Sequence, residues 1–100
     1  MRRGTLTQPG FGLYPILMVF DSSEKSGRFA LETLHCGGTF VLKESHDNVF
    51  LYSYDNEYGT GCESGVTAKI EILSENNLQL TAFRRTGQFF SSGTLRRTDK

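Results

Sequence analysis

Short runs in which apolar and polar residues alternate constrain this chain more than any other feature. The clearest run is Val66–Leu73, where Val66, Ala68, Ile70 and Ile72 fall on one face of an extended segment. Such runs are interrupted about every ten residues by Gly, Ser, Asn or Asp, which favour turns. No segment carries a convincing helical period. The pattern therefore predicts an all-β chain built from hairpins.

The spacing of these runs predicts about eight strands in one domain. A chain of 100 residues suits a single core, so residues 1-100 are taken as one domain. No link is long enough for a helix joining parallel strands, so consecutive strands are expected to pair antiparallel as a meander. The one long irregular segment, Asp55–Gly65, resembles the structured loops that often carry function. The expected strands are Gly4–Gln8, Tyr14–Asp21, Arg28–Cys36, Thr39–Glu44, Val49–Tyr54, Val66–Leu73, Leu78–Arg84 and Phe89–Arg97.

The two end strands indicate how the meander protects its edges. The first, Gly4–Thr7, and the last, Gly93–Arg96, carry the same light alternation. With an even number of strands they run antiparallel and can pair, which removes both edges. We therefore expect a small closed or nearly closed β-barrel, lipocalin-like in architecture, with a β-sandwich as the alternative. Because the chain is short and rich in Phe, Leu and Ile, its interior is expected to be mostly filled.

The charge balance and the N-terminal segment bear on partners. Lys and Arg number 11, as do Asp and Glu, so the formal net charge is zero. A neutral domain lacks the net field that draws nucleic acid or an anionic membrane, so neither is expected as a partner. The apolar run Phe11–Phe20 is too short to span a bilayer, and no small-residue cleavage site follows it. The chain is expected to be soluble, with no membrane span and no signal that defines its compartment.

Catalytic and metal-binding patterns are not recognisable. Ser91 and Ser92 lack the Gly-x-Ser-x-Gly context of a hydrolase nucleophile, and Gly59–Gly61 has neither the helix nor the lysine of a phosphate-binding loop. His35 and Cys36 are adjacent, so on a strand they point to opposite faces and do not share one metal ion. We expect no catalytic residue, no metal and no cofactor, and an enzyme is the least favoured class of function.

Several short elements occur in a characteristic order. They are Gly4–Gln8, Tyr14-Pro15, Leu34–Thr39, Gly61-Cys62 with Gly65, and Gly93–Arg97. Together they resemble a small bacterial β domain that occurs alone or at the extracytoplasmic end of some actinobacterial serine/threonine kinases. The resemblance covers most of the chain and implies a barrel-like β fold. It implies no activity, because the family has no catalytic motif to carry over. This sequence contains no kinase portion and no clear export signal, so a cell-surface sensor role does not transfer.

The same resemblance implies that Cys36 and Cys62 meet, since members of the family commonly keep one Cys in each of the two corresponding elements. A disulfide between them would stabilise the fold by about 3–4 kcal/mol through the lost entropy of the unfolded chain. It would also require an extracytoplasmic or otherwise oxidising compartment. The alternative is a pair of reduced thiols packed close together, so their redox state is the best guide to localisation.

Aromatic residues supply the first candidate site. Phe50, Tyr52 and Tyr54 share one face of a strand, Tyr58 lies beyond them, and Phe90 belongs to a similar two-faced apolar pattern in the last strand. One interpretation is that these residues line the barrel mouth or a partner surface, since Tyr offers both contact area and a hydroxyl. The other is that they fill the barrel interior and pack beneath the long loop.

Arginine pairs supply the second candidate site. If the barrel closes, Arg2 and Arg3 lie beside Arg96 and Arg97 at one rim, which would suit contact with an anion or an acidic peptide. The alternative is a solvated rim, partly compensated by Glu75 in a neighbouring turn, where each charge pair contributes less than about 1 kcal/mol.

Two hypotheses of function follow. The first is a non-enzymatic binding module, either for a small ligand at the barrel mouth or for a protein partner. The second is a self-associating structural or accessory protein, which forms a homodimer through exposed aromatic residues and is carried on a mobile gene cassette. A monomer with an open apolar cavity favours the first hypothesis. A dimer that buries Tyr52, Tyr54 or Phe90 favours the second.

Overall fold

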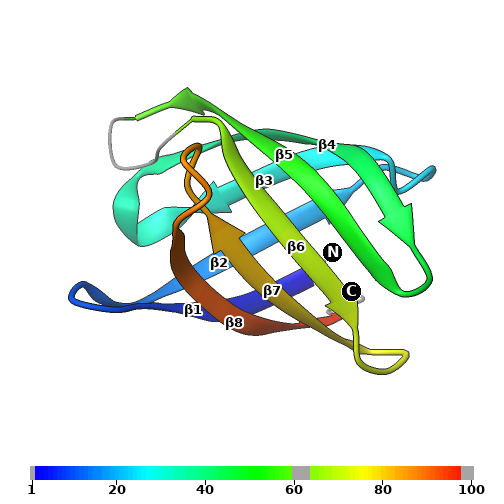
Figure 1. The fold of residues 1–100 in the computed structure, drawn as a ribbon. Helices are drawn as coiled ribbons and strands as arrows, with labels where there is room; N and C mark the ends of the chain where they lie inside the picture. Colours follow the sequence, from blue (N-terminus) through cyan, green and yellow to red (C-terminus); the bar gives the residue numbers. More distant parts are fainter. Residues whose placement is uncertain (1, 60–63, 98–100) are drawn as a thin grey trace.

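The computed structural model describes residues 2–59 and 64–97 and shows a closed barrel of eight antiparallel strands (Figure 1). Each strand pairs with the next along the chain, and β1 pairs with β8 to complete the cylinder. The predicted meander and its predicted closure are both confirmed. The strands are β1 (Arg2–Gln8), β2 (Gly12–Phe20), β3 (Ser26–Leu31), β4 (Cys36–His46), β5 (Val49–Tyr58), β6 (Val66–Ile72), β7 (Asn77–Phe83) and β8 (Phe89–Arg97).

The seam between β1 and β8 depends on two glycines. Gly4 lies opposite Leu95, and Gly93 lies opposite Leu6. A Cβ on Gly93 would collide with the carbonyl oxygen of Thr5, and a Cβ on Gly4 would collide with that of Thr94. The absence of a side chain at these positions lets the two end strands approach closely enough to close the barrel.

The interior is filled at its middle by side chains from most of the strands. Met18, Phe40, Leu80 and Leu95 are fully buried, at 1% exposure or less. Tyr54 stacks on Phe40 with ring centroids 5.4 Å apart, and its hydroxyl donates to Sδ of Met18 over 2.9 Å. The alternation of the sequence puts these residues inside, and their volume leaves no continuous channel along the axis.

The predicted strand Arg28–Cys36 is wrong at its C-terminal end. β3 stops at Leu31, a 3-10 helix covers Glu32–Leu34, and His35 adopts a left-handed conformation with φ 53°. The predicted strands leave Gly37 and Gly38 in the connection between them, but both glycines belong to β4. They serve close packing there, because a Cβ on Gly38 would collide with the carbonyl oxygen of Asp55.

The long loop predicted at Asp55–Gly65 is shorter than expected. β5 continues to Tyr58, and its last residues pair with Gly37–Thr39 of β4 across a bulge. The pairing satisfies backbone groups that a loop would leave to solvent. The remaining connection runs from 59 to 65, and residues 60–63 within it lie outside the described part of the chain. No helix in the described segments is both long and apolar enough to cross a membrane.

Candidate functional site

The two ends of the barrel differ. At the end that carries the β1–β2 turn, the buried Tyr14 hydroxyl donates to Oε1 of Gln8 over 3.2 Å. Phe11 packs against the Tyr14 ring in an edge-on arrangement, with ring centroids 5.7 Å apart. These side chains therefore cover part of the interior here. At the opposite end, where Arg2 begins β1, the interior opens into a pocket.

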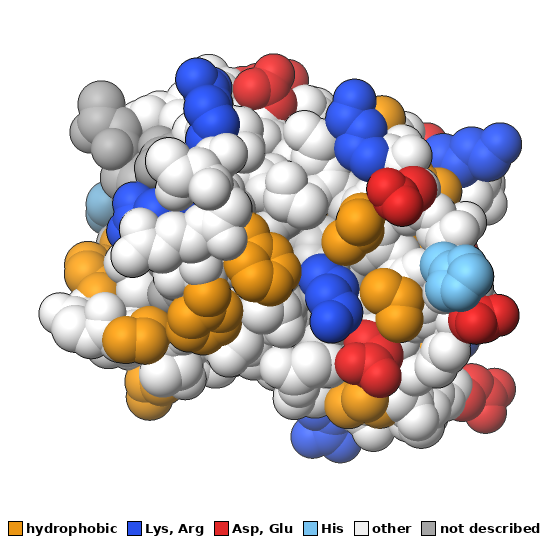
Figure 2. All heavy atoms as spheres, viewed as in Figure 1, with side chains coloured by type: hydrophobic (Ala, Val, Ile, Leu, Met, Phe, Trp, Pro, Cys, Tyr) orange, Lys and Arg blue, Asp and Glu red, His pale blue; other side chains and the backbone are white. Residues whose placement is uncertain are grey.

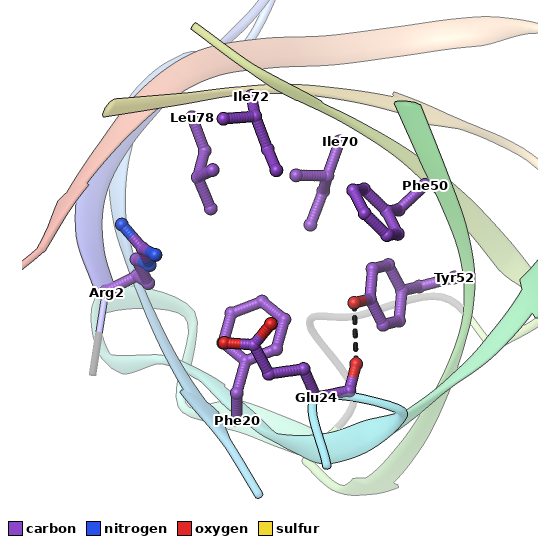
Figure 3. A pocket seen from close by; sticks show the side chains of 8 residues that line it. All are labelled: Arg2, Phe20, Glu24, Phe50, Tyr52, Ile70, Ile72 and Leu78. Carbon is purple, nitrogen blue, oxygen red and sulfur yellow. Dashed lines mark hydrogen bonds between the residues drawn. The ribbon is translucent and has the colours of Figure 1, made fainter. Parts of the chain in front are cut away.

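The open pocket has a volume of about 50 Å³. Figure 3 shows its side chains arranged around the opening, with Phe20 and Glu24 on the side opposite the aliphatic residues and Arg2 between Phe20 and Leu78. They come from β1, β2, the β2–β3 turn, β5, β6 and β7. The lining residues are Arg2, Phe20, Glu24, Phe50, Tyr52, Ile70, Ile72 and Leu78.

Most of the pocket wall is apolar and rests on the packed core. Phe20 contacts Phe40 and Tyr52 edge-on, with ring centroids 4.9 and 5.8 Å apart. Phe50 and Ile70 lie directly opposite each other on β5 and β6, so both side chains stand on the same inner face. A ligand group entering here would meet hydrocarbon on its sides and a filled core beneath it, which suits an apolar group.

Tyr52 ties the mouth of the pocket to a neighbouring turn. Its hydroxyl donates to the backbone carbonyl of Glu24 over 2.8 Å, as drawn in Figure 3. Burial raises the pKa of Tyr52 to about 12, and the nearby carboxylates of Glu24 and Asp21 act in the same direction. Tyr52 therefore stays neutral near pH 7 and keeps the proton that it donates.

The turn itself is held by the carboxylate of Asp21. Oδ1 accepts hydrogen bonds from the backbone N–H and the hydroxyl of Ser23, and Oδ2 accepts one from the hydroxyl of Ser26. The bonds from Ser26 and Ser23 lower the pKa of Asp21. Glu24 sits in a left-handed conformation, with φ 62°, inside this network. The turn therefore presents the Glu24 side chain to the pocket from a defined backbone position.

Arg2 brings a positive charge to the mouth. Its Nη1 is buried and has no hydrogen-bond partner among residues 2–59 and 64–97. Arg2 and Glu24, both of which the structure describes, are not joined by an ion pair within 4.0 Å. A buried guanidinium N–H without an acceptor has lost its hydration without gaining a hydrogen bond in return.

The predicted arginine cluster is brought together by barrel closure. Arg2 lies opposite Arg97, and Arg3 lies opposite Arg96. Strand alternation puts Arg2 on the inner side of the wall, whereas Arg3 and Arg96 are exposed on its outer surface. The β6–β7 turn lies at the same end, where the backbone N–H of Arg97 donates to the carbonyl of Asn76 over 3.0 Å.

The predicted aromatic group is divided by the fold. Tyr52 lines the pocket, but Tyr54 lies deeper in the core and is 6% exposed. Neither side chain has enough free area to form a partner surface. Tyr58 is exposed at the other end of the barrel, beside Gly37. The strand backbone of Phe90 belongs to β8, but its side chain lies outside the described atoms.

Of the two cysteines, Cys36 lies in the described part of the chain and Cys62 does not. Cys36 is 1% exposed at the start of β4, whereas Cys62 lies outside the described residues. A Cβ on Gly59 would lie 3.0 Å from Cβ of Cys36, so the chain passes Cys36 three positions before Cys62. This approach is compatible with the predicted pairing.

Sequence reasoning missed most of the pocket. Strand alternation assigns Phe20, Ile70 and Leu78 each to one face of a strand, but their level along the barrel axis depends on how far each strand is shifted against the next. Glu24 lies in a turn, and no periodic signal reports where a turn side chain points. The two-residue offset between Tyr52 and Tyr54 could have identified one as nearer the rim, had the register been known.

The polar groups of the pocket lining are one guanidinium, one carboxylate and one phenol, from Arg2, Glu24 and Tyr52. None of the eight lining residues is a Ser, Thr, Cys or His, so the described pocket contains no hydroxyl–histidine or thiol–histidine pair. No group of three His, Cys, Asp or Glu side chains in the described segments is arranged to hold a metal ion. The sequence matches no protein-family model, and no curated protein is significantly similar to it.

Proposed function

We propose that this chain is a non-enzymatic binding module that takes a small ligand at the open mouth of its barrel. The observation that carries the proposal is the pocket at the end of the barrel where Arg2 begins β1. Its walls are mostly apolar, and the hydroxyl of Tyr52 and the carbonyl of Glu24 are hydrogen-bonded at its rim. If the side chains at this end only filled the core, the barrel would have no such opening.

The volume limits what can enter. A buried water needs a cavity volume of about 10–15 Å³, so a pocket of about 50 Å³ has room for roughly four waters. This is enough for a short alkyl chain or the edge of one ring, and too little to enclose a whole drug-sized ligand. The ligand is therefore expected to insert one apolar end and to keep its remaining atoms at the rim.

Titration with hexan-1-ol, followed by ¹H–¹⁵N correlation spectra of the full chain, tests this proposal. The backbone amides of Phe20, Phe50 and Ile70 should shift in a saturable manner. Ile72 stands at the rim with 38% exposure, so Ile72→Trp should fill the mouth and abolish the shifts. Leu73→Trp is the matched control, because Leu73 is 54% exposed and does not line the pocket.

Two results would overturn the proposal. One is the absence of saturable shifts in the wild-type chain. The other is binding that survives Ile72→Trp unchanged, since the ligand would then occupy a different surface.

Self-association is the second candidate, and exposed apolar residues favour it. Phe11 and Leu13, near the β1–β2 turn, are 57% and 71% exposed. Figure 2 shows hydrophobic side chains gathered at the end of the barrel that carries the β1–β2 turn. Such a patch is larger than scattered single residues and suits contact with another protein. The resemblance to a bacterial β domain favours neither candidate, because it implies no activity.

A further inference from the structure

We infer that the mouth pocket recognises a small monocarboxylate with a short apolar tail, whose carboxylate pairs with the guanidinium of Arg2. This inference rests on the proposed binding function and specifies the class of its ligand. The tail would occupy the apolar part of the pocket, and the carboxylate would stay at the rim.

Arg2 faces inward at the point where the pocket meets solvent. Leu6, four positions further along β1, is buried in the barrel interior, and strand alternation puts Arg2 on the same face. Nη1 is shielded from water, yet no acceptor in the described chain reaches it. Buried charged donors in native proteins are almost always paired, so Nη1 is suited to an acceptor that residues 2–59 and 64–97 do not provide.

The surroundings reinforce the preference for an anion. Arg97 lies directly opposite Arg2 across the β1–β8 seam, so two positive residues face each other in register. Like charges in directly opposite strand positions repel each other. Guanidinium groups also match carboxylates geometrically, because two parallel N–H donors meet two oxygens.

Glu24 limits the charge of the ligand. Its side chain lines the same mouth, as Figure 3 shows, and its carboxylate would repel any second negative charge on the ligand. A phosphate monoester, which carries close to two charges at neutral pH, is disfavoured more than a carboxylate, which carries one. The apolar walls formed by Phe50, Ile70 and Leu78 require a hydrocarbon tail rather than a free inorganic ion.

Four probes with six carbon atoms each test the inference: hexanoate, hexan-1-ol, hexylamine and hexyl phosphate. Their affinities for the full chain can be compared by the spectral titration described above. Hexanoate should bind about tenfold more tightly than hexan-1-ol, which is the gain expected from one charge-assisted hydrogen bond. Hexylamine and hexyl phosphate should both bind more weakly than hexanoate.

Arg2→Met preserves the apolar stem of the side chain and removes the charge. It should reduce the preference for hexanoate over hexan-1-ol to about one and leave hexan-1-ol binding in place. Arg3→Met is the matched control. Arg3 is exposed on the outer side of the same strand, and its substitution removes the same net charge. The preference should survive in this control.

The outcomes separate this inference from the proposed function. If hexan-1-ol binds in the pocket and hexanoate binds no more tightly, the carboxylate assignment is overturned and the binding function stands. If neither probe binds, both fail. If Arg2→Met does not fold, the wild-type chain still decides, because hexanoate must shift the guanidinium resonances of Arg2 and hexan-1-ol must not. Equal loss of preference in Arg2→Met and Arg3→Met would also overturn the assignment, because it would indicate a general charge effect.

Discussion

The hydroxyl of Tyr52, on β5, donates a hydrogen bond of 2.8 Å to the backbone carbonyl of Glu24, in the turn between β2 and β3. The two residues are 28 positions apart in the chain, so the bond joins distant segments across the mouth of the barrel. It holds the turn against the wall of the pocket. The donor ring and the Glu24 side chain both line that pocket, so the bond also sets the distance between its apolar and polar parts.

Tyr52→Phe should lower the free energy of unfolding by about 1 kcal/mol, because the Glu24 carbonyl loses a partly buried donor. Hydrogen exchange at the backbone amides of Ser23 and Lys25 should become faster as the turn loosens. Urea denaturation and exchange spectra measure the two effects. Tyr58→Phe serves as the control, since Tyr58 is 49% exposed and should cost little. Equal losses in the two variants would contradict the role of this bond.

The same tyrosine should make stability depend on alkaline pH. Burial raises the pKa of Tyr52 to about 12, whereas an unfolded tyrosine titrates near 10. The folded chain holds the proton more tightly, so this contribution is complete below pH of about 10 and is lost as the pH rises to about 12. Across that window, urea midpoints of the wild type should fall further than those of Tyr52→Phe. Tyr54, whose pKa is also raised by burial, contributes to both proteins. Parallel curves would contradict the prediction.

Closure of the barrel should be sensitive to Gly93. Gly93→Ala brings a methyl group against the carbonyl of Thr5, so the β1–β8 seam must widen. We expect a loss of about 1–3 kcal/mol in urea denaturation, with the fastest increase in amide exchange along β1. Thr7 lies in the same seam but is exposed, so Thr7→Ala should lower the free energy of unfolding by less than about 1 kcal/mol. Unchanged exchange along β1 in Gly93→Ala would show that the seam tolerates the methyl group.

The predicted disulfide can be tested by counting thiols. Protein produced in an oxidising compartment and then denatured should show no free thiol if Cys36 and Cys62 are bridged. Reduction should then lower the free energy of unfolding by about 3–4 kcal/mol. A double Cys36→Ala, Cys62→Ala variant controls for the effect of the reductant itself. Two titratable thiols in the untreated protein would refute the bridge and remove the argument for an extracytoplasmic location.

Sedimentation velocity should distinguish the two candidate functions. A chain that acts through its barrel mouth is expected to sediment as a monomer of 11.2 kDa. If a dimer forms, Leu13→Asp should dissociate it, because Leu13 is 71% exposed in the apolar region near the β1–β2 turn. Tyr52 and Tyr54 cannot form that interface, since both are already buried within one chain. A dimer that resists Leu13→Asp would place the interface elsewhere.

Strand identity and barrel closure were accessible from residue patterns. Alternation in Val66–Leu73 depends on the two-residue repeat of an extended chain and on nothing distant. The matching end strands also predicted that Arg2 and Arg3 meet Arg96 and Arg97, because pairing follows from strand parity. The end of β3 at Leu31 could not be predicted from residue patterns. Gly37 and Gly38 fall between two predicted strands, but in the structure they belong to β4 and their small size serves strand contact.

The amino-acid sequence by itself determined which faces of the strands turn inward and that the chain ends meet. Only the tertiary structure decided that Tyr52 lines an opening while Tyr54, two positions on, lies in the core. It also decided that Nη1 of Arg2 is buried at the mouth with no acceptor in the described chain. The physical reason is that periodicity depends on local backbone geometry, whereas depth and partnership depend on how neighbouring strands are shifted and what volume their side chains fill.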